Sequence, residues 1–97
     1  MIKHVVCFKL KDNSRASCEA ARDVLLSMNG RVDLIRDLRV GIDFLHSDRS
    51  YDIILEVVLD NEEALEKYQI HPYHAGTVKT YMRQVRAESI SVDYVLD

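Results

Sequence analysis

The residues best suited to chemistry lie together in one segment, residues 67–76, which reads KYQIHPYHAG. The segment contains two tyrosines, two histidines and the single proline of the chain. A histidine can accept a proton near neutral pH, and a tyrosine hydroxyl can donate a hydrogen bond to a carbonyl or enolate oxygen. Tyr68 together with His74 would therefore suit the formation of a carbanion next to a carbonyl group.

Pro72 predicts how this segment folds. A proline lacks a backbone donor and disfavours helical angles in the residue before it, so the preceding helix should stop near Ile70. Proline is also favoured at the first position of a helix, which predicts a second helical piece from Pro72 through Val85. His71 then has a structural explanation, as a helix-end residue that bonds a free carbonyl. The break would bring Tyr68 and His74 to one cavity.

The remaining sequence predicts the element order βαββαβ. Alternating apolar and polar residues predict strands over residues 2–10, 34–44, 51–59 and 87–96. Apolar residues at helical spacing predict a first helix, capped by Asn13 or Ser14 and ended by Gly30. A second helix begins at DNEE, where Asp60 as N-cap and Glu63 would form a capping box. This order predicts an α+β, ferredoxin-like fold, with a four-stranded antiparallel sheet and both helices on one face.

The sheet is predicted to have two apolar faces. His4 shares one face of the first strand with apolar residues, whereas Val5 and Cys7 lie on the other. Ile54 and Val58 continue that second face on the third strand. A sheet covered on one side only should be polar on the other. We therefore expect a second copy of the chain to cover it, in a homodimer that joins through its sheet faces as a dimeric α/β barrel.

Composition narrows the class of protein. The 97 residues predict a single domain over 1–97, and 47% hydrophobic with 30% charged residues is a globular balance. A net charge of -3 without a basic stripe argues against a nucleic-acid partner, and the short apolar runs argue against a membrane. The N-terminal residues lack the pattern of a signal peptide, so we expect a cytoplasmic location. Cys7 and Cys18 form no CxxC motif and are expected to be reduced thiols.

The chain resembles the stress-responsive α/β-barrel (Dabb) family over nearly its whole length. The stretches that carry the resemblance are KHVVCFK, GIDF, YDIILEVVLDNEEALEKY and, most specifically, YQIHPYHAG. The resemblance implies a homodimer of ferredoxin-like subunits that together form a dimeric α+β barrel. In the plant polyketide cyclase branch of this family, a histidine acts as base and a tyrosine as its partner in an aldol condensation.

By this resemblance the two catalytic roles would fall on His74 and Tyr68. His4 matches a histidine of the cyclase branch on the first strand and would line the same pocket. Ile53 stands where that branch has another pocket histidine, which removes a polar contact from this chain. The predicted pocket residues are thus His4, Ile53 and His71.

Each candidate also has a structural interpretation. Tyr68 could be a core residue whose hydroxyl is satisfied, and His4 a strand histidine with a partner; His46, in a predicted hairpin, would be solvated. A metal is not expected, because His71 and His74 lack helical ligand spacing and no nearby carboxylate or cysteine completes the set. The dimeric scaffold also hosts haem-degrading monooxygenases, but no residue pattern argues for haem, so no cofactor is predicted.

Two functional hypotheses remain from the sequence. The first is a homodimeric Dabb-type domain with a pocket for a small apolar or phenolic ligand, carrying out cyclase-type or lyase-type acid/base chemistry on a carbonyl compound. The second is a non-enzymatic dimer that binds a small ligand or is simply stable under stress. The coincidence of His4, Tyr68 and His74 on elements that face one cavity favours a functional pocket.

Overall fold

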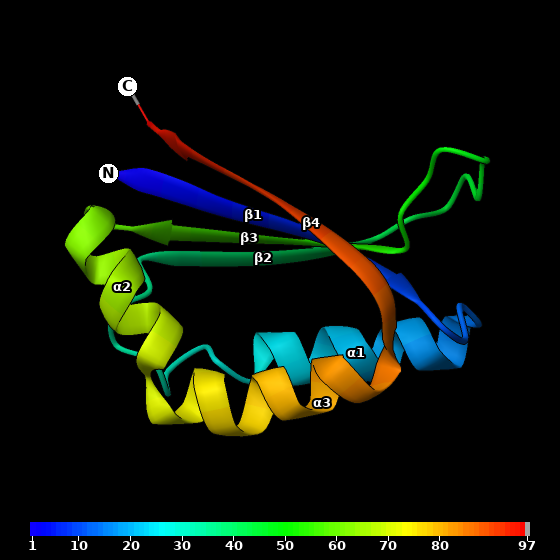
Figure 1. Ribbon diagram of the computed structural model, residues 1–97, viewed down its shortest axis with the longest axis horizontal. Coiled ribbons are helices and arrows are strands. Elements are labelled where there is room, and N and C mark those ends of the chain that lie inside the picture. The colour runs from blue at the N-terminus through cyan, green and yellow to red at the C-terminus, as the bar shows by residue number, and fades with distance from the viewer. Residues whose placement is uncertain (97) are drawn as a thin grey trace.

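The computed structural model describes residues 1–96 and places helices on one face of a single antiparallel sheet (Figure 1). The sheet order is β2-β3-β1-β4. Its connections give a ferredoxin-like α+β fold, as the sequence predicts. In chain order the elements are β1 (Ile2–Leu10), α1 (Arg15–Leu26), β2 (Asp37–Ile42), β3 (Ile53–Leu59), α2 (Glu62–Ile70), a π-helical segment (Tyr73–Val78), α3 (Lys79–Val85) and β4 (Arg86–Val95).

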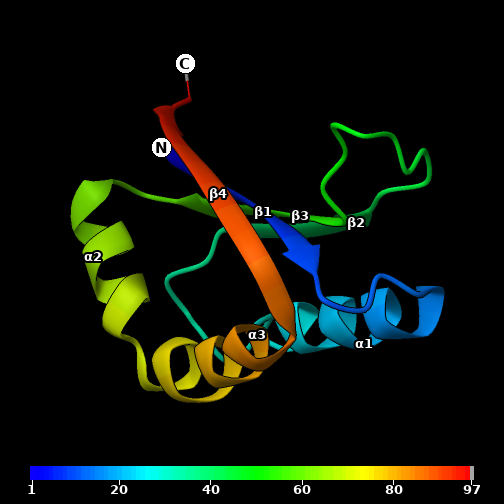
Figure 2. The ribbon, with the colours of Figure 1, turned by 45° about the vertical axis from the view of Figure 1, so that its right-hand side comes forward.

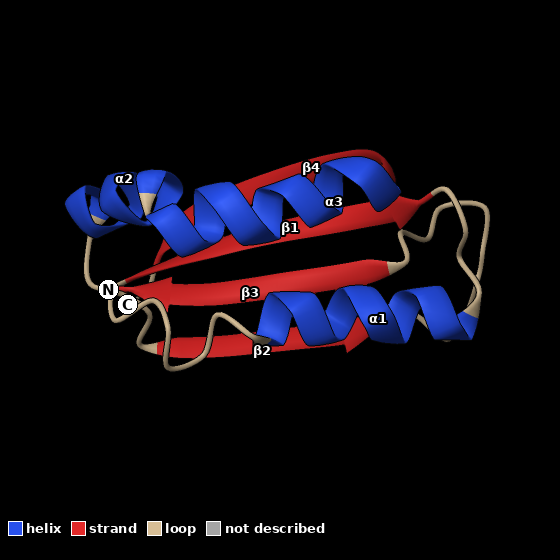
Figure 3. Cartoon of the chain, turned by 90° about the horizontal axis from the view of Figure 1, so that it is seen from below, coloured by secondary structure: helices blue, strands red, loops and turns tan. Residues whose placement is uncertain are grey.

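Strand β1 lies in the middle of the sheet and fixes the register of the strands around it. It pairs with β3 on one side and with β4 on the other, both antiparallel. His4 is thereby opposite Val57 on β3 and Asp93 on β4. Seen from the helical side, α1 lies over β2 and β3, while α3 lies over β1 and β4 (Figure 3). Residues of β1 and β4 that point to this side therefore face α3.

The first helix and the second strand are shorter than predicted. Helix α1 starts after Ser14, whose side chain accepts a bond from the Ser17 amide, but it ends at Leu26. Gly30 lies in the following turn with φ 81°, a conformation that glycine adopts without strain. Strand β2 starts only at Asp37, because the apolar residues before it, Leu34 and Ile35, pack on the core from a turn instead of pairing as a strand.

The predicted cap of α2 is wrong by one residue. Asn61 is the N-cap, and its side-chain oxygen accepts a bond of 2.8 Å from the Ala64 amide. Asp60 instead accepts two bonds from the Arg36 guanidinium, at 2.9 and 2.8 Å. A planar guanidinium bonds a carboxylate in this paired geometry more strongly than a neutral donor would. The pairing takes Asp60 out of the capping position.

The helix break at Pro72 is confirmed, but the second helical piece opens as a π-helix. Helix α2 ends at Ile70, and the His71 amide donates to the Tyr68 carbonyl. Residues Tyr73–Val78 then form a wide turn in which the Lys79 amide bonds the His74 carbonyl, before α3 continues. Wide turns of this kind occur frequently at functional sites. Here the turn carries His74.

The core lies between the helices and the sheet, whereas the opposite sheet face is open. Tyr68, Leu25 and Met28 are among the largest fully buried side chains. No helix of residues 1–96 covers the other face (Figures 1 and 2). That face exposes Ile54, Ile90, Val92 and Tyr94 at 37%, 50%, 60% and 46%. An apolar sheet face is thus left without a cover from the chain itself.

Candidate functional site

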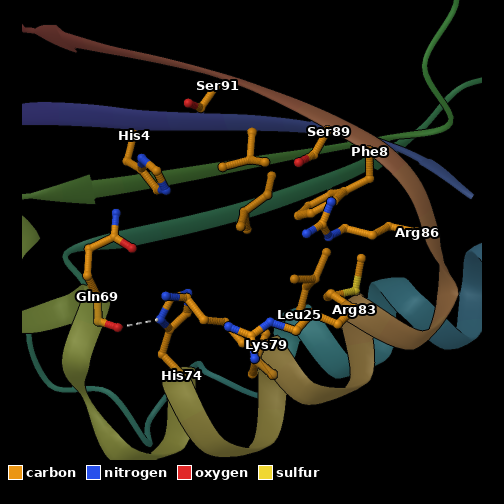
Figure 4. Close-up of a pocket in the computed structure, with 14 residues that line it drawn as sticks. His4, Phe8, Leu25, Gln69, His74, Lys79, Arg83, Arg86, Ser89 and Ser91 are labelled. Carbon is orange, nitrogen blue, oxygen red and sulfur yellow. Dashed lines mark hydrogen bonds between the residues drawn. The ribbon is translucent and has the colours of Figure 1, made fainter.

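A cavity of about 350 Å³ lies between the sheet and the helical segment 69–86 (Figure 4). Its floor comes from β1 and β4, and its opposite wall comes from the π-helical segment and α3. The volume is in the range that holds a small organic ligand. The lining residues are His4, Val6, Phe8, Leu25, Leu55, Gln69, His74, Val78, Lys79, Met82, Arg83, Arg86, Ser89 and Ser91.

His74 presents an unprotonated nitrogen to this cavity. The residue is 7% exposed, and its Nδ1 lies 3.4 Å from the backbone oxygen of Gln69. A carbonyl oxygen can only accept, so Nδ1 carries the proton and Nε2 is left as an acceptor. Burial lowers the pKa of His74 from 6.5 to about 4, opposed by the Gln69 bond and reinforced by the charge of Lys79. His74 is therefore neutral at physiological pH.

His4 forms a pair with Asp93 across the β1–β4 ladder. The Nδ1 atom of His4 contacts the Oδ1 atom of Asp93. An ionised carboxylate can only accept, so this contact places the proton on Nδ1 and leaves Nε2 free. A carboxylate in this position also fixes the orientation of the ring. The sequence analysis did not single out Asp93, because its partner on β1 depends on a strand register that alternation alone does not specify.

Tyr68 lies behind the two histidines and outside the cavity lining. Its ring stacks on that of His74, with centroids 4.2 Å apart and an interplanar angle of 33°. It also meets the His4 ring in an edge-on contact, with ring centroids 5.8 Å apart. The hydroxyl donates to the sulfur of Met28 at 3.7 Å, and burial raises the pKa of Tyr68 above its ordinary value. Tyr68 thus supports both rings while its hydroxyl points into the core.

His71 and Ile53 lie outside the cavity lining as well. His71 is the C-cap residue that follows α2, and its Nδ1 accepts a bond of 3.1 Å from the Tyr73 amide. The predicted helix-end role is therefore present, although the partner is an amide and not a carbonyl. Ile53 is 2% exposed in the core, opposite Phe8 on β1. Leu55, two residues further on the same face of β3, lines the cavity instead.

The other end of the cavity is basic, which the sequence analysis missed. Arg83 of α3 and Arg86 at the start of β4 line it together with the hydroxyl of Ser89, and Lys79 of α3 lines the cavity between them and His74. The signal in the sequence was the spacing of four between Lys79 and Arg83, which puts both on one helix face. Within residues 1–96, no group of three or more histidine, cysteine or acidic side chains is placed to hold a metal ion.

The fold and the cavity define a small ferredoxin-like domain with paired histidines between its sheet and helices. The family model of the stress responsive A/B barrel domain (Dabb) matches residues 2–96. The chain therefore belongs to the Dabb family. No curated protein sequence matches it. Among residues 1–96 no helix is both long and apolar enough to cross a membrane.

Solved structures show the same fold at low sequence identity. A dimeric ferredoxin-like protein of unknown function from Bacteroides fragilis is 22% identical with TM-score 0.82, over 98% of this chain and 95% of that one. A Dabb family protein from Mesorhizobium loti is 21% identical with TM-score 0.74, over 99% and 96%. A hydroxynitrile lyase from Passiflora edulis is 11% identical with TM-score 0.83, over 99% and 93%.

Proposed function

We propose that this protein is a homodimeric Dabb enzyme that transfers a proton at the carbon next to a carbonyl group of a small ligand, as cyclases and lyases do. The observation that carries the proposal is the pair of imidazoles, His4 and His74, which share one cavity with each Nδ1 already engaged. Each ring therefore offers only Nε2 to a ligand. Oriented imidazoles of this kind are suited to general acid–base catalysis.

His4 is the proton acceptor in this proposal. The Asp93 carboxylate bonds its Nδ1 and orients its ring, whereas burial opposes a charge on His74. In the proposed reaction, Nε2 of His4 takes the proton, the C–H electron pair becomes an enolate, and the imidazolium later returns the proton to carbon or to a new alkoxide. The family resemblance assigns the base to His74. We propose instead that neutral His74 accepts a hydrogen bond from a hydroxyl of the ligand.

Tyr68 acts in this proposal as a positioning residue. Its ring contacts both histidines, so its removal would let each imidazole rotate away from the ligand. The hydroxyl is engaged with Met28 and is not needed for proton transfer. Tyr68→Phe should therefore retain turnover, whereas Tyr68→Ala should lose both packing and turnover. Equal losses in the two variants would return the hydroxyl to the catalytic role.

The homodimer is supported by the open sheet face. Ile90, Val92 and Tyr94 together with Ile54 expose an apolar patch that a second sheet could bury. Two solved structures with this fold are described as dimeric proteins, from Bacteroides fragilis and Thermobifida fusca. Solution mass at low micromolar concentration tests this part, and a monomer would contradict it.

The catalytic part is tested by deuterium exchange. Phenolic and β-keto compounds would be incubated with the protein in deuterated water, and the loss of proton signal next to the carbonyl would be followed by NMR. We expect exchange that falls by roughly a hundred-fold or more in His4→Gln, as loss of a general base typically costs. His46→Gln is the matched control, since His46 lies in the exposed loop between β2 and β3. Binding without exchange would favour the non-enzymatic hypothesis.

A further inference from the structure

The basic end of the cavity assigns a second recognition site within the same pocket. Lys79 and Arg86 are half-buried and Arg83 is exposed, and all three line the cavity. Figure 4 shows Arg83, Arg86 and Ser89 at the end away from His4 and Gln69, and Lys79 between that end and His74. The chain as a whole is acidic, with a net charge of -3. The local gathering of cations is therefore not a consequence of a basic composition.

These three cations have no acidic partner within the part of the chain that the structure describes. None of them takes part in an ion pair with a residue of 1–96. The two acidic residues of β4 are engaged elsewhere. Glu88 bonds Lys9 at 3.3 Å, and Asp93 bonds His4 at the far end of the cavity.

A structural explanation accounts for only part of this cluster. A cation in the last turn of a helix interacts favourably with the helix dipole, which explains Arg83. Lys79 is the first residue of α3 and gains nothing from that effect. It lies close enough to His74 for its charge to contribute to the lowered pKa of that residue. Three like charges around one hollow favour a bound oxyanion.

The rest of the cavity lining is largely apolar. It includes Val6, Phe8, Leu25, Leu55, Val78 and Met82. From His4 to Phe8 the floor follows four residues of β1, which is about 14 Å at the usual rise of a strand. A ligand that reaches both ends is therefore elongated, with an apolar middle.

We propose that the ligand is an elongated carbonyl compound that carries an oxyanion, a carboxylate or a phosphate, at its far end. The cations Lys79, Arg83 and Arg86 bind the oxyanion, and the apolar lining holds the chain. The carbonyl end then lies at His4 and His74. This inference rests on the proposed function for the carbonyl end, whereas the oxyanion end is recognised independently of any proton transfer.

Three probes with the same eight-carbon chain separate the contribution of the oxyanion from that of the apolar chain and its ketone. They are 7-oxooctanoate, its neutral amide 7-oxooctanamide, and 7-oxooctyl phosphate, each titrated by NMR into the full-length protein. We expect the carboxylate to bind about ten-fold or more tightly than the amide, as charge-assisted bonds to arginine typically give. The phosphate arm identifies the source of the oxyanion, because the tighter of the two anions names the natural group.

Two substitutions locate the effect. In Arg83→Gln and in Arg86→Gln the preference for carboxylate over amide should fall several-fold. Arg49→Gln removes the same charge from the exposed loop between β2 and β3 and should keep the full preference. The inference is overturned if the amide binds as tightly as both anions, if none of the three compounds binds, or if the preference survives in both variants.

The same probes keep this inference distinct from the proposed function. Deuterium exchange next to the ketone of 7-oxooctanoate reports on His4, and affinity reports on the cations. A carboxylate preference without exchange would refute proton transfer and retain the oxyanion site. If the acid and the amide bind equally tightly and exchange at the same rate, proton transfer would be retained and the oxyanion site would be refuted.

Discussion

Acidification should destabilise the wild-type fold more than that of a His74→Gln variant. The pKa of His74 is lowered from 6.5 to about 4 by burial, so the unfolded chain binds more protons than the folded one between these values. The stability contributed by neutral His74 is therefore present above pH 6.5, the pKa of the unfolded chain. It is lost as the pH falls from 6.5 to about 4, the pKa in the folded protein. The sign is opposite to that of a histidine with a raised pKa.

The size of this effect follows from the shift. At about 1.4 kcal/mol for each pH unit, the interval between 6.5 and about 4 corresponds to roughly 3 kcal/mol. One edge of the ring faces the cavity, where solvent screens part of the charge, so we expect about 2 kcal/mol. Glutamine cannot be protonated in this range, and its variant loses only what the other groups of the chain lose.

Urea denaturation of both proteins, followed by circular dichroism at several pH values, measures this difference. The protomer concentration must be held constant, because a dimer is stabilised by mass action. The wild type should lose about 2 kcal/mol more than His74→Gln between about pH 7 and about pH 4. Equal losses would refute the burial argument, as would an NMR titration that places His74 at its ordinary value.

Four further substitutions test the fold around the site and the proposed dimer. Tyr68→Phe removes only the bond to Met28 and should cost less than about 1 kcal/mol in thermal denaturation; a larger loss would mean that the hydroxyl has a stronger partner. Asn61→Ala should cost about 1 kcal/mol as the loss of an N-cap, and more than Asp60→Ala, whose partner is an exposed arginine. Val92→Lys should shift the protein toward monomer in sedimentation measurements, and an unchanged mass would remove Val92 from the interface.

The fold could be predicted because its signals are local. Alternation marks strands, helical spacing marks helices, and Pro72 marks the break, all within short windows. The N-cap of α2 could not be predicted from the sequence, because Asp60 and Asn61 are both residue types that cap helices well. The choice depends on Arg36, which comes 24 residues earlier and binds Asp60. The predicted boundaries of β2 were wrong for a similar reason, because Leu34 and Ile35 are half-buried through tertiary packing on the core and not through strand pairing.

The sequence predicted part of the site, namely the part that follows from the order of the elements. The element order alone brings His4, Tyr68 and His74 to one side of the sheet, and the structure shows their rings in contact through Tyr68. The bond between His4 and Asp93 depends on the register of β4 on β1, which only the folded sheet defines. The direction of the Tyr68 hydroxyl depends on Met28, a residue of the turn after α1.

The most direct test of the proposed proton transfer is deuterium exchange with the Asp93→Asn variant. Asparagine keeps the size of the side chain and leaves His74 and the basic end of the cavity in place. It replaces the carboxylate that accepts from Nδ1 of His4 and orients the ring, so exchange next to the carbonyl should fall by roughly ten-fold or more while ligand affinity stays the same. Unchanged exchange in Asp93→Asn would contradict the account.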